Sequence, residues 1–363
     1  MASYYETACR KLEELRGRDD VTVLAIESSC DETASAIVRG RQILSGVIST
    51  QISIHRLYGG VVPEIAGRRH VLAVSGVVSH ALEQAKLTMD DIDAVAVTYG
   101  AGLIGALLVG VTTAKGLAFA HSKPLIAVNH IQGHIAANYL AHPDLTPPYI
   151  GLVVSGGHTA VINVKSYTDI EILGQTLDDA CGEAFDKVAK VLGLPYPGGP
   201  SIEKAAKGGK NNIPMPRPLN KKNCLDFSYS GLKTAVINAV RNAERAGAPL
   251  PPEDVACSFQ TAAIDMLVEN AYAATKMAGV KRIAISGGVA ANEYLREQLA
   301  RLSEKHGVEV LCPPKYLCAD NAAMIGCCAC HLIKSGIAAA PLDLDACANL
   351  KMTDRYEPDG GNK

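Results

Sequence analysis

The sequence predicts an α/β protein of two related lobes that face each other across a cleft. Two stretches, beginning at Val21 and Tyr149, each read as an apolar strand, a short polar loop, a second strand, a turn and a third strand. Two later stretches, DDIDAVAVTYGAGLIGALLVGVTTAKGLA and GVKRIAISGGVAANEYLREQLARL, each read as a strand, a glycine-rich loop and a helix. Glycine is abundant, at 33 residues, and tryptophan is absent, which favours α/β architecture with many tight turns.

Four polar or glycine-rich loops stand at matching places in the two repeats. Loops of this kind, between a strand and a helix, point backbone N–H groups into the cleft, where an anion would sit. Glycines can also merely permit tight turns. Because four loops match in two repeats, a nucleotide cleft is the favoured interpretation. The layout is that of the actin, sugar-kinase and heat-shock ATPase superfamily.

Composition limits the classes of function. Hydrophobic residues make up 48% and charged residues 20% of the chain, as in a globular protein. The net charge is −2, so nucleic-acid contact needs a local basic patch or a partner subunit. The eleven cysteines form no paired framework, and the acidic N-terminus is typical of neither a transit nor a signal peptide. We therefore expect a cytoplasmic protein.

Two apolar segments have a second interpretation. AGLIGALLVGVTTAKGLAFA is the most membrane-like run, but Thr112, Thr113 and Lys115 interrupt it, so a buried helix is predicted instead of a membrane span. The cysteines in GCCACHLI are open to a metal interpretation, yet their neighbours are small and apolar. Small buried core residues are favoured there, since free cysteine packs as a small hydrophobe.

The segment NHIQGHIAANY places His130 and His134 four residues apart. Strand PLIAVN should end near Asn129, so both imidazoles would share one face of the following helix. They could hold one metal ion together with a third ligand, for which Asp320 at a loop-to-helix junction is the candidate. They could equally be ordinary buried histidines. Zinc proteases use H-E-x-x-H, and here Ile131 takes the place of the glutamate base.

Eight motifs occur in order along the chain. They are IESSCDET, YGGVVPEIAGRRH, NHIQGHIAA, VVSGGHT, DDACGEAFDKVAKVLGLPYPGGP, FSYSGLKTA, SGGVAANEYLR and CADNAAMIG. Together they resemble the TsaD family, the catalytic subunit of tRNA threonylcarbamoyladenosine synthesis, formerly labelled O-sialoglycoprotein endopeptidase. The resemblance runs from about Val21 to about Asp345.

The resemblance implies a reaction, a metal and a substrate site. The family transfers threonylcarbamoyl from threonylcarbamoyl-adenylate to N6 of the adenosine adjacent to the tRNA anticodon, position thirty-seven, and releases AMP. It binds one divalent metal ion, usually iron and sometimes zinc, and its ligand motifs match His130, His134 and Asp320. Its substrate loop matches Val153, Val154, Ser155, Gly156 and Gly157. Its ribose and adenine contacts match Asp186 and Gly199, and its remaining nucleotide contact matches Asn292.

Four acidic residues are interpreted separately. Asp31 follows the first strand and could position the amine nucleophile or accept its proton; alternatively it is a turn or helix cap. Asp179 and Glu183 share a predicted helical face with Asp186, and a solvated face is the interpretation kept for those two. Glu203 stands where many relatives carry aspartate, so no nucleotide contact is assigned to it.

The resemblance also implies an organisation and partners. We expect an N-terminal extension over 1–20, a first lobe with the histidine pair over 21–148, a second lobe with the adenylate-binding loops over 149–319, a C-terminal helix returning to the first lobe over 320–345, and a tail over 346–363. The implied partners are tRNA, a TsaB-type paralogue and a TsaE-type ATPase, with no membrane. A basic segment is a candidate for phosphate contact; its cations are Lys204, Lys207, Lys210, Arg217, Lys221 and Lys222.

Three alternatives belong to other classes. A metalloprotease would agree with the former family label but lacks the glutamate base. An inactive nucleotide-binding scaffold would have no need of the histidine pair and Asp320. A sugar kinase of the same superfamily would transfer phosphate from ATP.

Overall fold

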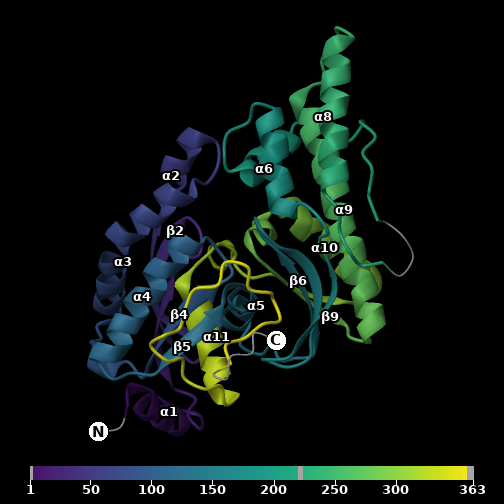
Figure 1. Cartoon of the computed structure of the whole chain (residues 1–363). Coiled ribbons are helices and arrows are strands. Elements are labelled where there is room, and N and C mark those ends of the chain that lie inside the picture. Colours follow the sequence, from purple (N-terminus) through teal and green to yellow (C-terminus); the bar gives the residue numbers. More distant parts are fainter. Residues whose placement is uncertain (1–2, 220–223, 358–363) are drawn as a thin grey trace.

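Two five-stranded sheets form the framework of the chain in a computed structural model, which describes residues 3–219 and 224–357 (Figure 1). The first sheet has the order β3-β2-β1-β4-β5, with β1 (Thr22–Glu27), β2 (Glu32–Arg39), β3 (Gln42–Thr50), β4 (Ala94–Gly100) and β5 (Leu125–Asn129). The second has the order β10-β9-β6-β7-β8, with β6 (Tyr149–Val154), β7 (Thr159–Val164), β8 (Ile170–Gln175), β9 (Arg282–Ser286) and β10 (Glu309–Leu311).

The two sheets have the same topology. In each, the first three strands pair antiparallel as a meander, and the last two join parallel to the first strand. The parallel pairs are connected through helices, as right-handed crossovers require. The duplicated α/β core expected from the sequence is therefore confirmed.

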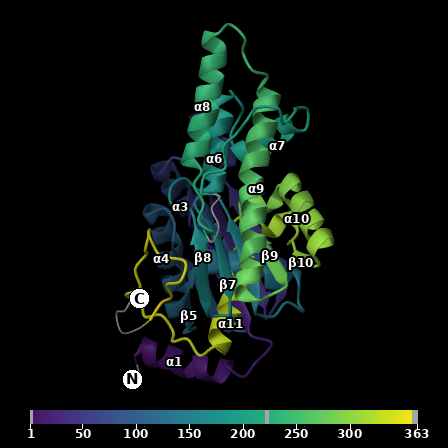
Figure 2. The ribbon, with the colours of Figure 1, turned by 90° about the vertical axis from the view of Figure 1, so that its right-hand side faces the viewer.

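Helices cover both sheets and fill the space between them. They are α1 (Tyr4–Leu15), α2 (Ile52–His55), α3 (Pro63–Ala85), α4 (Ile104–Ala120), α5 (His130–Ala141), α6 (Cys181–Val191), α7 (Gly198–Ala206), α8 (Ser230–Arg245), α9 (Pro252–Ala278), α10 (Glu293–His306) and α11 (Ala322–Lys334). Helices α3 and α4 cover the outer face of the first sheet, and α6 to α10 share a core with the outer face of the second. Figure 2 shows α8 and α9 extending beyond the sheets.

The central layer consists of α5 and α11, which lie between the sheets (Figure 1). Alternate residues of β1 serve the two faces of the first sheet: Val23 and Ala25 pack toward this central layer, and Leu24 and Ile26 pack toward the outer helices. The two central helices approach closely at Gly133, where an added Cβ would lie 2.6 Å from the side chain of Ile325. The glycine therefore sets the distance between the helices that carry the site.

The two apolar segments behave as predicted. The cysteines of α11, Cys327, Cys328 and Cys330, are buried in the central layer, which confirms their interpretation as small core residues. The membrane-like run forms α4, whose buried face packs on the first sheet. Among the described residues, no helix combines the length and apolar character needed to cross a membrane.

The first twenty residues include a docked helix. Leu12 of α1 is buried, and the hydroxyl of Tyr4 donates a 2.8 Å hydrogen bond to the carbonyl of Lys123. This N-terminal segment therefore packs on the first lobe instead of standing free.

Candidate active site

The N-terminal ends of the two central helices meet between the sheets. Asn129 ends β5 and caps α5, so His130 is the first helical residue and His134 follows one turn later. Asp320 stands just before Asn321, which caps α11. Since β5 and β10 are equivalent strands of the repeat, the helices that follow them bring residues distant in sequence to one point.

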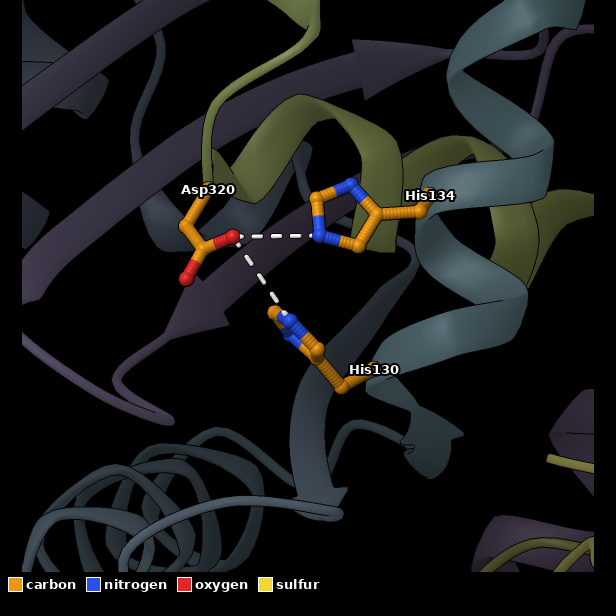
Figure 3. Close-up of side chains that lie close together, drawn as sticks. All are labelled: His130, His134 and Asp320. Carbon is orange, nitrogen blue, oxygen red and sulfur yellow. Dashed lines mark ion pairs between the residues drawn. The ribbon is translucent and has the colours of Figure 1, made fainter. Parts of the chain in front are cut away.

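The structure brings the three predicted metal ligands together (Figure 3). Nε2 of His134 lies 3.1 Å from Oδ1 of Asp320, and Nε2 of His130 lies 3.6 Å from the same oxygen. One ligand atom from each residue can be chosen so that all three lie within 4.8 Å of one another. Within the described part of the chain, this is the group of histidine, cysteine and acidic side chains arranged to hold a metal ion.

The hydrogen bonding of His134 fits a metal ligand. His134 is fully buried, yet among the described residues Nδ1 of its ring has no hydrogen-bond partner, and the neighbour of Nε2 is the Asp320 carboxylate at 3.1 Å. A buried nitrogen without a partner costs free energy unless another group satisfies it. Two imidazoles and one carboxylate are the donor set of catalytic zinc and non-haem iron sites. The residues present therefore fit a divalent metal ion.

The charged groups of the cluster shift one another's pKa values. Burial lowers the pKa of His130, but the carboxylates of Glu27 and Asp320 outweigh this effect and raise the pKa to about 9. Burial would raise the pKa of Asp320, but His130 and His134 hold it well below its ordinary value. The imidazole of His130 and the two carboxylates therefore stabilise each other's charged forms, and a metal ion bound at Nε2 would compete with a proton there.

His158 is a neighbour that the sequence analysis missed. Burial, with the nearby rings of His130 and His134, lowers the pKa of His158 to about 4, so this imidazole is neutral at physiological pH. Its backbone N–H donates to Oγ of Ser155, 3.1 Å away. The available signal was its place directly after the two glycines of the SGGH loop.

A pocket of about 450 Å³ adjoins the cluster. Its walls come from the β6–β7 loop, α6, α7, the segment before α10 and the segment before α11, and consist of Gly156, Gly182, Phe185, Asp186, Pro197, Gly199, Pro200, Glu203, Gly288, Val289, Ala291, Asn292, Lys315 and Ala319. Ala319 on this wall immediately precedes Asp320 in the chain, so the pocket and the metal-ligand cluster share the segment before α11.

The predicted substrate residues divide into two groups. Gly156, Asp186, Gly199 and Asn292 line the one pocket, and Ser155 and Gly157 belong to the same β6–β7 loop. Val153 and Val154 lie in β6, wholly buried in the core beneath that loop.

Glycines allow the pocket walls to approach one another. An added Cβ at Gly182 would lie 2.7 Å from the carbonyl oxygen of Ser155, and one at Gly198 would lie 2.4 Å from Cα of Asp186. The backbone N–H of Gly198 donates a 2.6 Å hydrogen bond to Oδ1 of Asp186. The carboxylate is therefore held at the junction of α6 and α7, with its second oxygen available to a ligand.

Asn292 also stabilises the helix that follows it. Its Oδ1 accepts a hydrogen bond from the backbone N–H of Leu295, 2.9 Å away, and its amide donates to Oε1 of Gln260, 3.0 Å away. We expect Asn292→Ala to lower the free energy of unfolding by about 1 kcal/mol through loss of the α10 cap. Chemical denaturation measures the change, with Asn292→Asp as the capping control. An unchanged midpoint for the alanine variant would contradict this role.

Two acidic residues of the β1–β2 region lie side by side. Asp31 is only 8% exposed. Burial and the charge of Asp31 raise the pKa of Glu32 to about 9, although Thr50 donates a 3.1 Å hydrogen bond to Glu32. The protein thus keeps a protonated carboxyl beside Asp31 at neutral pH, at a cost in stability.

The raised pKa of Glu32 gives a pH-dependent prediction. In the folded protein the pKa lies above the ordinary 4.5, so between pH 4.5 and about 9 the folded state binds more protons and this group's contribution to stability falls as pH rises. Glutamine does not ionise, so the Glu32→Gln variant does not lose stability in this way as pH rises. We expect the variant to be more stable than the wild type by on the order of 1 kcal/mol at pH 8 and to lose this advantage toward pH 5. Thermal unfolding across this range measures it; an advantage independent of pH would contradict the assignment.

The prediction of an acidic stripe on one helical face is partly wrong. Helix α6 begins at Cys181, so Asp179 lies before it, and its carboxylate pairs with Lys187 at 2.8 Å and Lys233 at 2.6 Å. Asp179 is therefore an ion-paired residue and not part of a solvated face. Glu183 is on α6 and pairs with Lys187 at 2.9 Å.

Some cations of the basic segment are engaged in ion pairs within the chain. Arg217 pairs with Asp265, and Lys207 pairs with Glu293 at 2.9 Å. Lys221 and Lys222 lie outside the described residues. Contact with phosphates through this segment stays a prediction.

Glu203, to which no contact was assigned, lies on the pocket wall. Its Oε1 accepts a hydrogen bond from the backbone N–H of Glu293, 3.1 Å away. It therefore links α7 to the start of α10 across the pocket.

Comparison with solved structures supports the fold. Full-length HypF, solved in a phosphate- and nucleotide-bound form, is similar over 87% of this chain and 46% of its own, with a TM-score of 0.59 and 14% identity. HypF of T. kodakarensis is similar over 88% of this chain and 48% of its own, with a TM-score of 0.59 and 16% identity. At these identities the likeness concerns the fold alone, and it agrees with the two-lobed architecture expected from the sequence.

Sequence comparison shows the family. Residues 42–327 match the family model described as TsaD, tRNA N6-adenosine threonylcarbamoyltransferase. A protein of that name from Clostridium botulinum (strain Kyoto / Type A2) is 52% identical over 93% of this chain and 100% of its own. Another of that name, from Clostridium perfringens (strain ATCC 13124), is 53% identical over the same shares. The chain belongs to the TsaD family of tRNA N6-adenosine threonylcarbamoyltransferases.

Proposed function

We propose that this chain transfers the threonylcarbamoyl group from threonylcarbamoyl-adenylate to N6 of adenosine thirty-seven, adjacent to the tRNA anticodon, and releases AMP. The observation that carries the proposal is the junction of pocket and cluster: Ala319 lines the pocket and Asp320 belongs to the ligand set. An adenylate whose nucleotide occupies the pocket would direct its reactive carbonyl toward the cluster.

The proposed metal centre consists of His130, His134 and Asp320, with iron as the expected ion and zinc as the alternative. Two nitrogen ligands and one oxygen ligand suit either ion and leave positions open. When bound, the ion would supply Lewis-acid stabilisation of the negative charge that develops on the attacked carbonyl oxygen.

The pocket residues bind and orient the nucleotide. The exposed loop at Gly156 and Gly157 allows backbone N–H groups to approach the phosphate. Asp186 accepts hydrogen bonds from the ribose hydroxyls, and Gly199 contacts the adenine. Val153 and Val154 act from the core by fixing the end of β6, from which the loop departs.

The transfer itself is an acyl substitution. The N6 amine attacks the carbamoyl carbonyl carbon, a C–N bond forms, the C–O bond to the phosphate breaks, and the amine loses a proton. AMP is a good leaving group, so protonation of its phosphate is not required. Asp31, in the loop after β1, is proposed to position the amine or to accept its proton.

The low net charge supports shared binding of tRNA. The net charge is −2, and two of the six candidate cations, Arg217 and Lys207, are already in ion pairs within this chain. We therefore propose that a TsaB-type paralogue and a TsaE-type ATPase act with it. A tRNA substrate and free thiols at all eleven cysteines agree with a cytoplasmic location.

The test combines the purified chain with threonylcarbamoyl-adenylate, a tRNA transcript and the two partner subunits. Mass spectrometry of the nucleosides should show threonylcarbamoyladenosine with stoichiometric AMP. A transcript that carries guanosine at position thirty-seven is the matched control and should gain nothing. Binding of the adenylate without any modified nucleoside would favour the scaffold alternative; neither that alternative nor the protease or kinase has an observation in its favour here.

A further inference from the structure

Glu27 is a buried carboxylate beside the metal-ligand cluster but outside it. It is the last residue of β1, is fully buried, and does not belong to the group of residues able to hold an ion. A buried carboxylate is costly unless hydrogen bonds satisfy it. The hydrogen bonds of Glu27 therefore indicate its role.

Both oxygens of Glu27 are hydrogen-bonded. Oε1 accepts from the backbone N–H of Ser29 at 2.5 Å, and Oε2 accepts from the hydroxyl of Thr98 at 2.6 Å. Oε2 also lies 3.0 Å from Nδ1 of His130. Strands β1 and β4 thus hold the carboxylate in place, and the carboxylate in turn holds one ring nitrogen of His130.

This contact determines which nitrogen of His130 faces the cluster. A histidine that binds a metal ion is the neutral imidazole, which carries one N–H; because a carboxylate only accepts, that proton belongs on Nδ1. Nε2 is then the nitrogen left for the ion, on the side of Asp320, whose Oδ1 lies 3.6 Å away. The hydroxyl of Ser29, 3.1 Å from Nδ1, is the competing partner.

The second histidine lacks such a support. Nδ1 of His134 is buried and has no hydrogen-bond partner among the described residues, so none of their carboxylates or carbonyls orients the ring through that nitrogen. Of the two imidazoles, His130 is the one whose Nδ1 contacts a carboxylate, that of Glu27, which is itself held by hydrogen bonds.

We propose that Glu27 is a positioning residue that fixes the tautomer and ring orientation of His130 for metal binding. The inference rests on the proposed function, because it requires an ion at His130, His134 and Asp320. Carboxylate groups behind a ligating histidine raise its basicity and fix its direction, and their loss weakens metal affinity by about 10- to 100-fold.

The test measures Zn²⁺ affinity of the full chain by competition with a chromophoric chelator. We expect Glu27→Gln, which removes the charge at constant shape, to bind Zn²⁺ about 10- to 100-fold more weakly than the wild type. Glu27→Asp keeps the charge but withdraws it by one methylene, so it should also lose affinity. Ser29→Ala removes the competing hydroxyl and leaves the carboxylate in place, so it should bind close to wild type. Thr98→Val removes one hydrogen bond that holds the carboxylate and should lose less affinity than Glu27→Gln.

Two further readouts separate positioning from general loosening. The visible spectrum of the Co²⁺-substituted protein should change in the Glu27 variants and stay unchanged in Ser29→Ala. Long-range proton–nitrogen NMR spectra of the Zn²⁺-loaded, histidine-labelled wild type should place the His130 proton on Nδ1.

Three results would overturn the inference. Wild-type affinity in a folded Glu27→Gln or Glu27→Asp variant would make the carboxylate purely structural. An equal loss in Ser29→Ala would show that the affinity does not depend specifically on the carboxylate contact to Nδ1. A wild type that binds no Zn²⁺ or Co²⁺ would remove the metal centre of the proposed function itself, which the first two results leave intact.

Discussion

Replacing His134 by alanine should abolish stoichiometric metal binding and reduce threonylcarbamoyl transfer by at least about a hundredfold, since Lewis-acid stabilisation supplies several kcal/mol. His134 is the fully buried ligand, and its Nε2 lies 3.1 Å from Oδ1 of Asp320. Its removal leaves two ligands where catalytic sites commonly use three. Elemental analysis of the purified variant and nucleoside mass spectrometry measure the two losses separately.

His331 provides the matched control for that substitution. It is also a buried histidine with a ring nitrogen lacking a hydrogen-bond partner, but it stacks on Tyr167 with ring centroids 4.3 Å apart, away from the ligand group. His331→Ala should lose stability while keeping its metal. If His134→Ala retained one ion per chain and normal turnover, the ligand assignment would be wrong.

Replacing Asp186 by alanine should raise the KM for threonylcarbamoyl-adenylate by about 10- to 100-fold, the effect of losing a hydrogen bond to a charged group worth about 1.5–3 kcal/mol. One oxygen of Asp186 accepts a hydrogen bond from the backbone of Gly198, and the residue lines the pocket proposed to bind the nucleotide. Metal content should not change, because Asp186 is not in the ligand group. Initial rates over a range of adenylate concentrations measure the effect.

Asp179 is the control carboxylate for this experiment. It stands close in sequence but pairs with Lys187 and Lys233 and does not line the pocket. Asp179→Ala should leave the KM for the adenylate near the wild-type value. Equal effects of the two substitutions would contradict a ribose contact by Asp186.

The duplicated fold was predictable because its signals are local. Apolar strand runs, turn residues and the placing of glycine loops recur within each half, and the two sheets repeat the same strand order. The helix start at His130 followed from the end of an apolar strand and the Asn129 cap. Asp320 could be named from its loop-to-helix junction and the family motif, but only the packing of α5 against α11 shows that it meets the histidines.

The remaining features depend on tertiary contacts that no sequence window contains. β6 is covered by helices on both faces, so its residues give no alternation to show that Val153 and Val154 face the core. Asp179 has the spacing of a helical stripe, but α6 begins only at Cys181. One of its two lysine partners, Lys233, lies on a different helix, so the sequence around Asp179 does not reveal the ion pair. Glu27 was an unremarked strand residue until β4 and α5 supplied its partners.

The most direct test of the account is metal removal and reconstitution of the wild-type chain. The protein is stripped with a chelator, reloaded anaerobically with graded amounts of Fe²⁺ or Zn²⁺, and assayed with threonylcarbamoyl-adenylate, tRNA and the partner subunits. We predict negligible transfer by the stripped protein and a linear recovery that ends at one ion per chain. Full transfer by stripped protein that still binds the adenylate would contradict the account.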